Sequence, residues 1–137
     1  MLFRSAVKLW VETGDRELCD RMCREKGLNS IYAAESGLGR MAMPPRENIN
    51  LNVVSVGDVA FAMMPYEVFD TNAAFIKEQS PYKMSVIATC ANSVRNYIPS
   101  QLGFNHGGYS VDRCRYMPGT GELLADEFVA MLKEVHG

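Results

Sequence analysis

Residues 49–90 restrict the fold more than any other part of the chain, because the spacing of their apolar side chains changes along them. Apolar and polar residues alternate over 49–53, which predicts a half-buried strand from Ile49 to Val56. Gly57-Asp58 is typical of a turn. The run 59–64 (VAFAMM) is then apolar at every position, as in a central strand covered on both faces of its sheet.

A helix and a second strand follow this run. Residues 67–79 have helical spacing, Ser80-Pro81 ends that segment, and 83–90 (KMSVIATC) predicts the next strand. A strand, helix, strand unit makes its two strands parallel. The pattern therefore predicts an α/β fold, in which a mixed sheet contains a βαβ crossover unit and helices from both ends of the chain cover the sheet.

Helical periodicity marks both ends of the chain. Two helices are expected within 3–26, the second capped by Asp15 and ended at Gly27, and a short helix is expected over 31–41. A last helix is expected over 122–135. Its expected apolar stripe consists of Leu123, Leu124, Phe128, Met131 and Leu132. The stretch 91–116 is interpreted as irregular, and its length predicts a functional loop.

Composition excludes several classes of protein. The 137 residues, 47% of them apolar and 22% charged, predict a single domain over 1–137. A net charge of −2 disfavours partners such as nucleic acid or anionic lipid. No apolar stretch approaches the roughly 20 residues that span a bilayer. The chain is expected to be soluble, without a signal peptide or a transmembrane segment, and its compartment stays open. Cys19 and Cys23 are interpreted as structural thiols.

Polar side chains follow both parallel strands of the predicted unit. Glu67 comes after the first strand, and Asn92 and Tyr97 come after the second. Because ligands collect outside the carboxyl ends of parallel strands, these residues are expected to share one rim. Glu67 is also expected at a helix N-terminus, whose partial positive charge keeps a carboxylate ionised. The residues alone leave open whether Glu67 is a ligand or base, or only complements the helix end.

Several short segments resemble, in their order and spacing, the neutral/alkaline, non-lysosomal ceramidases and their bacterial relatives. They are 56–61 (VGDVAF), 65–69 (PYEVF), Ser80-Pro81, Ala91-Asn92, 97–100 (YIPS), 107–109 (GGY) and 118–122 (PGTGE). The resemblance is clearest from Asn50 to Val135. It implies the carboxy-terminal portion of a larger zinc-dependent amidase domain, which hydrolyses the N-acyl amide of ceramide-type lipids to a fatty acid and an amine.

The resemblance also implies roles for four residues. It assigns Glu67 and Tyr97 to two zinc-ligand positions and Tyr109 to a catalytic tyrosine that faces the substrate carbonyl. It assigns Asn92 to the substrate-binding loop. A zinc-bound water would then attack the amide, while the Tyr109 hydroxyl donates to the oxyanion.

The chain also departs from the family in informative ways. The two histidine ligands of the family have no counterpart, since His106 and His136 occupy no matching position. Tyr66 replaces the glycine of the family's PGE motif, and Val94 replaces an aromatic residue. A catalytic zinc normally has three or more protein ligands, so zinc is expected only when the missing histidines are supplied. Alone, the chain is expected to be inactive.

Two other interpretations stay open. The chain could be a non-catalytic module that keeps the packing of this fold and uses its rim for binding or oligomer contacts. It could also self-associate and build a site across subunits. The expected partners are accordingly a lipid amide substrate, a second copy of the chain, or an amino-terminal portion that carries the histidines. Members of the ceramidase family that the chain resembles are often exported.

Overall fold

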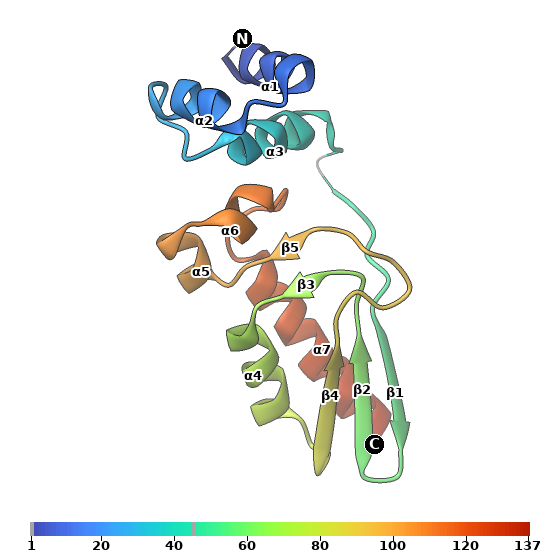
Figure 1. The fold of residues 1–137 in the computed structure, drawn as a ribbon. Helices are drawn as coiled ribbons and strands as arrows, with labels where there is room; N and C mark the ends of the chain where they lie inside the picture. Colours follow the sequence, from blue (N-terminus) through green and yellow to red (C-terminus); the bar gives the residue numbers. More distant parts are fainter. Residues whose placement is uncertain (1, 45) are drawn as a thin grey trace.

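A three-stranded mixed sheet forms the centre of the computed structural model, which describes residues 2–44 and 46–137 (Figure 1). The sheet has the order β1-β2-β4, with bounds Asn52–Val56, Val59–Met63 and Met84–Ala88. β1 is antiparallel to β2 across the turn at Gly57, and β2 is parallel to β4. α4 (Asp70–Gln79) connects the parallel pair. The predicted α/β fold with a mixed sheet and a βαβ unit is confirmed.

Of the remaining elements, α7 (Thr120–His136) packs along one face of the sheet, and the others lie toward one end of it (Figure 1). Two short strands, β3 (Glu67–Val68) and β5 (Tyr97–Ile98), form a separate parallel pair. The other helices are α1 (Leu2–Thr13), α2 (Arg16–Arg24), α3 (Ile31–Ala42), α5 (Gln101–His106) and α6 (Tyr109–Arg113). None of the helices in the described part of the chain is long and apolar enough to cross a membrane.

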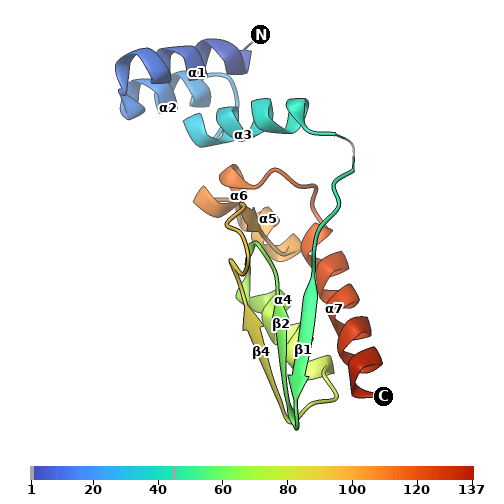
Figure 2. The ribbon, with the colours of Figure 1, turned by 90° about the vertical axis from the view of Figure 1, so that its right-hand side faces the viewer.

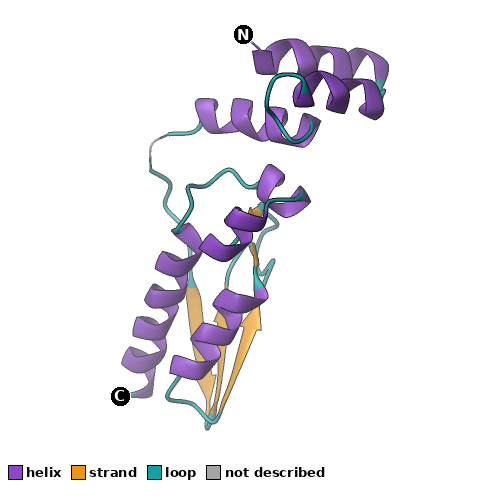
Figure 3. Ribbon diagram, turned by 90° about the vertical axis from the view of Figure 1, so that its left-hand side faces the viewer, coloured by secondary structure: helices purple, strands orange, loops and turns teal. Residues whose placement is uncertain are grey.

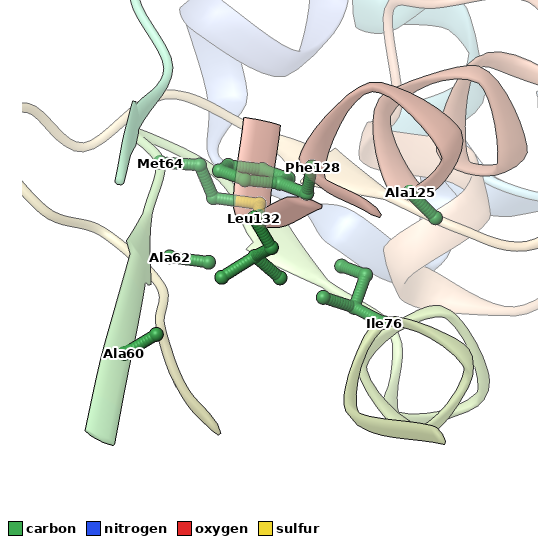
Figure 4. Packing of buried hydrophobic residues seen from close by; sticks show 7 residues of the cluster. All are labelled: Ala60, Ala62, Met64, Ile76, Ala125, Phe128 and Leu132. Carbon is green, nitrogen blue, oxygen red and sulfur yellow. The ribbon is translucent and has the colours of Figure 1, made fainter. Parts of the chain in front are cut away.

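The core lies between the sheet and two helices. Figure 4 shows this cluster, in which Phe128 and Leu132 of α7 and Ile76 of α4 face Ala60 and Ala62 of β2. Small alanines on the strand let the helices approach closely, and the large side chains of the helices fill the space. α4 and α7 therefore cover the same face of the sheet, as Figures 1 and 2 both show.

The other face of the sheet has no such cover, which contradicts the expectation of a β2 buried on both faces. Phe61 on β2 and its register partners Val54 and Val86 are exposed. The expectation that helices from both ends cover the sheet holds for α7 alone. The amino-terminal helices instead lie beyond one end of the sheet (Figure 3), because their apolar residues pack on one another. The buried members of this second cluster are Ala6, Cys19, Cys23, Ile31 and Ala34.

Local signals in the sequence located the amino-terminal helices well. The Asp15 carboxylate accepts from the amide of Leu18 at 3.0 Å and caps α2, as predicted. Gly27 has the expected positive φ of 79°. Cys19 and Cys23 are buried, and burial is the main cause that raises the pKa of both thiols, which fits a structural role.

Other boundaries differ from the predictions. β1 begins at Asn52 rather than Ile49, and α4 begins at Asp70 rather than Glu67. The stretch 91–116 is not irregular, since it contains β5, α5 and α6. Leu123, expected on the inner stripe of α7, is exposed. These differences share one cause: tertiary pairing and packing, rather than local periodicity, decide where a short element starts and which side it buries.

Phe128→Ala tests the packing of α7 on the sheet. Phe128 is fully buried, so removing its ring should lower the free energy of unfolding by about 3–5 kcal/mol. Leu123→Ala on the same helix is the control, because Leu123 is 71% exposed and its loss should change the free energy by less than about 0.5 kcal/mol. Urea denaturation followed by circular dichroism measures both. Equal effects of the two substitutions would contradict this packing.

Candidate functional site

Glu67 and Tyr97 are register partners in the small parallel pair of β3 and β5. The amide of Glu67 donates to the Asn96 carbonyl at 3.3 Å, and the amide of Phe69 donates to the Ile98 carbonyl at 3.4 Å. Neighbouring strands lie about 4.8 Å apart, and paired residues point to the same side. The carboxylate of Glu67 and the phenol of Tyr97 are therefore side by side, although 29 residues separate them in the sequence.

The loop after β4 fastens β3 in this position. Three of its amides, from Cys90, Ala91 and Arg95, donate to the carbonyls of Tyr66, Met64 and Pro65 at 3.2, 2.9 and 2.8 Å. Cys90 and Asn92 adopt positive φ angles of 55° and 63°, which are uncommon for residues other than glycine. Such conformations persist where surrounding contacts over-determine them. The loop therefore forms a rigid support for the Glu67 backbone.

A chain of hydrogen bonds fixes the residue before Glu67. The fully buried Tyr66 hydroxyl donates to the Tyr116 hydroxyl at 2.8 Å, and Tyr116 donates to Glu47 at 2.7 Å. Glu47 also pairs with Arg95 of the β4–β5 loop. The two tyrosine rings pack edge to face, 5.4 Å apart. The bulky Tyr66 thus anchors β3 to the connector before β1 and to the segment before α7.

Tyr109 joins the Glu67 and Tyr97 pair from another element. It is the first residue of α6, and its ring centroid lies 5.9 Å from that of Tyr97 at an interplanar angle of 76°. On its other side it meets the Tyr32 ring of α3, 5.1 Å away. Tyr109 is 53% exposed, so its hydroxyl can reach a ligand. The structure brings Glu67, Tyr97 and Tyr109 together, as the sequence predicted.

α3 holds α6, and so Tyr109, in place. The Asp112 carboxylate accepts from the Ser30 hydroxyl at 2.6 Å, and Arg113 pairs with Glu35 at 2.6 Å. The Arg113 guanidinium also lies 5.5 Å from the centre of the Tyr32 ring. The amino-terminal helices therefore position a candidate site residue that lies far from them in the sequence.

The surroundings of Tyr97 keep its phenol neutral. Burial raises the pKa of Tyr97 most, and the negative charge of Glu67, the neighbouring Tyr109, hydrogen bonding to Glu67 and the nearby Cys90 raise that pKa further. A neutral phenol is a hydrogen-bond donor and a poor metal ligand. A divalent cation bound by the Tyr97 phenol would have the opposite effect, because its charge favours the phenolate.

Asn92 lines a cavity that Glu67, Tyr97 and Tyr109 do not line. This polar cavity of about 660 Å³ lies at the carboxyl ends of β2 and β4. The other lining residues are Ile49, Asn50, Leu51, Asn52, Pro65, Ala91, Ser93 and Arg95. The expected placement of Glu67 at a helix N-terminus is wrong: α4 has Phe69 as its N-cap and Asp70 in its first turn. Glu67 instead belongs to β3, which pairs with β5.

Neither histidine contacts Glu67, Tyr97 or Tyr109 in the interactions that the structure shows. His106 is the exposed last residue of α5, and His136 at the end of α7 packs edge to face on Tyr82, 4.9 Å away. Among the residues that the structure describes, no three His, Cys, Asp or Glu side chains form a group that could hold a metal ion. The oxygen donors that this chain offers at the pair are Glu67 and Tyr97.

Sequence reasoning missed two residues of the site. Tyr32 lies on a helix for which the sequence predicts no functional role, and no residue near it in the sequence indicates its contact with Tyr109. Cys90 was interpreted as the end of a strand, whereas it lies in the supporting loop with its thiol near Tyr97. Long-range packing produces both contacts, so neither has a local signal.

Comparisons with known proteins add no relative. Scans against protein-family models, curated proteins and solved structures each found no match for this chain.

Asp112→Ala tests whether α3 holds α6. Loss of the half-buried charged acceptor of Ser30 should cost about 1–3 kcal/mol of local stability and speed hydrogen exchange of the Asp112 and Cys114 amides, which close α6. Hydrogen exchange read by NMR measures this. Asp58→Ala is the control, because Asp58 pairs with Lys83 at the far end of the sheet. Equal exchange in both variants would show that α6 is held by other contacts.

Proposed function

We propose that β3, β5 and α6 carry part of a zinc-dependent amidase site of the ceramidase type. The observation that carries this proposal is the pairing of Glu67 with Tyr97 in register, with the Tyr109 ring 5.9 Å from the Tyr97 ring. The resemblance of segments between Asn50 and Val135 to that family supports the same roles. The remaining zinc ligands would be histidines from a polypeptide outside the described residues.

The donor set fits zinc in part. Carboxylate and phenolate oxygens both coordinate zinc, and a catalytic site adds imidazole donors and keeps one position for water. Glu67 is exposed, so its carboxylate is accessible to a cation. Tyr97 needs the cation itself to lower its raised pKa. The chain alone should therefore bind zinc weakly, and added imidazole donors should strengthen the binding.

Each residue of this chain has a separate task in the proposed reaction. When bound, zinc would supply an activated water and polarise the amide carbonyl. Glu67 and Tyr97 would hold the cation, because the pairing of β3 with β5 fixes their backbones side by side. Tyr109, half-exposed and supported by Tyr32, presents its hydroxyl as a donor to the developing oxyanion. The products of N-acyl amide hydrolysis would be a fatty acid and an amine.

The first test measures zinc binding with and without imidazole. Imidazole from solution can occupy the ligand positions that histidine would fill, so 10 mM imidazole should raise the zinc affinity by roughly tenfold. Glu67→Gln and Tyr97→Phe should each remove this increase. Tyr82→Phe is the matched control, since Tyr82 is a half-buried tyrosine beside His136. Competition with a chromophoric zinc chelator measures all four proteins.

Cys90→Ser belongs in the same series, because the Cys90 thiol lies near Tyr97 and is a competing zinc donor. An imidazole effect that persists in Cys90→Ser and disappears in Tyr97→Phe supports the proposed pair. An imidazole effect that is unchanged in Glu67→Gln and Tyr97→Phe would refute it.

The second test measures amide hydrolysis. The chain is coexpressed with the polypeptide encoded immediately upstream, and fatty acid release from an N-acyl sphingoid amide is followed. Tyr109→Phe should lower kcat by roughly 10²–10³-fold while the zinc content stays constant, as expected for an oxyanion donor. Leu102→Ala, an exposed residue of α5, is the control. Zinc-dependent hydrolysis that is insensitive to Tyr109→Phe and Glu67→Gln would contradict these roles.

A non-catalytic binding module is the second candidate function. The observation that favours it is the uncovered apolar face of the β1-β2-β4 sheet, which is independent of the Glu67 and Tyr97 pair. Zinc binding distinguishes the two candidates, because a binding module has no need of the imidazole effect described above.

A further inference from the structure

The sheet presents one apolar face to solvent, and we call it the outer sheet face. Its large exposed side chains are Val54 and Val56 of β1, Phe61 of β2, and Met84 and Val86 of β4. Their exposed fractions are 50%, 69%, 37%, 59% and 36%. All five point away from α4 and α7, because the core residues of β2 alternate with Phe61 along the strand.

Register makes these residues one continuous surface. Val54, Phe61 and Val86 form one row across the three strands, since Val54 pairs with Phe61 and Phe61 pairs with Val86. Val56, Val59 and Met84 form the next row in the same way. Large apolar side chains in adjacent rows of a sheet are typical of a buried face. A parallel strand pair in particular is usually covered on both faces.

The charge and shape of the outer sheet face suit a second copy of itself. The six residues of the two rows carry no ionisable group, so two copies would meet without like-charge repulsion. The nearest charges, Asp58 and Lys83, already neutralise each other at one end of the sheet. A two-fold interface requires a surface that complements itself, and flat rows of Val, Phe and Met on a sheet meet this condition.

The area of the face limits the strength of such an interface. At about 150–200 Å² for a whole side chain, the five exposed fractions leave roughly 400 Å² of apolar surface on each copy. Two copies would bury roughly 800 Å², below the 1,200 Å² or so at which stable complexes begin. A face of this size supports a weak and reversible dimer, not a permanent one.

We propose that two copies of this chain pack their outer sheet faces together as a β-sandwich, in a reversible homodimer with α4 and α7 on the outside. β1 contributes to the same surface as an edge strand with the sequence NVVSV, which has none of the charged residues or prolines that keep edge strands apart. The interface is separate from the Glu67 and Tyr97 pair and does not depend on zinc.

Sedimentation equilibrium from 5 to 500 µM tests the dimer. The wild-type chain should shift from monomer to dimer with a dissociation constant of roughly 10–500 µM. Val56→Lys and Met84→Lys should each weaken the dimer at least about tenfold, because a lysine ammonium would be buried in the apolar interface. Leu123→Lys is the matched control: Leu123 is 71% exposed on α7, away from the outer sheet face, and its variant should dimerise like the wild type.

Methyl NMR of the wild-type chain locates the interface without any substitution. The Met84 methyl signal should move with protein concentration, whereas the signal of Met117, 73% exposed outside the sheet, should stay constant. A chain that stays monomeric at 500 µM would overturn the proposal. A dimer that survives Val56→Lys and Met84→Lys, or one that shifts Met117 instead of Met84, would also overturn it. Binding of the monomeric chain to phosphatidylcholine vesicles, lost in Val56→Lys, would assign the face to lipid instead.

Discussion

The parallel pairing of β3 with β5 is the interaction on which the candidate site depends. Each strand has two residues, and so short a pair has little stability of its own. Backbone hydrogen bonds from the β4–β5 loop and the Tyr66, Tyr116 and Glu47 chain supply the missing support. A carboxylate and a phenol thereby share a fixed position without belonging to a long element. Irregular backbone is rigid here because its polar groups are satisfied.

The amino-terminal helices extend this arrangement instead of covering the sheet. They form their own apolar cluster, and α3 contacts α6 through Asp112, Arg113 and the ring of Tyr32. Tyr109 consequently lies between aromatic rings from two parts of the chain. Because the amino-terminal helices pack on one another and on α6, they do not cover the second face of the sheet. The Val, Phe and Met side chains of β1, β2 and β4 on that face are therefore exposed.

Much of the fold could be predicted from local patterns, and the site only in part. Asp15 caps the start of α2 and Gly27 adopts its positive φ in the turn after that helix, as their backbone preferences predict, and the apolar run of β2 indicated a central strand correctly. The meeting of Glu67, Tyr97 and Tyr109 followed from the expected topology and from the resemblance to ceramidases. Tyr32 and Cys90 had no such signal, because their contacts join segments that are distant in the sequence.

The sequence by itself determined the order of the longer helices and strands, the parallel crossover and the kinds of donor available, since capping, turns and periodicity act over a few residues. The short elements β3, β5, α5 and α6 were not predicted. Only the tertiary structure decided that Glu67 belongs to a strand and not to a helix end, and that Asn92 lines a cavity that Glu67 does not line. It also decided that β2 is covered on one face. The physical reason is that burial and strand register depend on which strand or helix packs beside a segment. The sequence of one segment does not identify that neighbour.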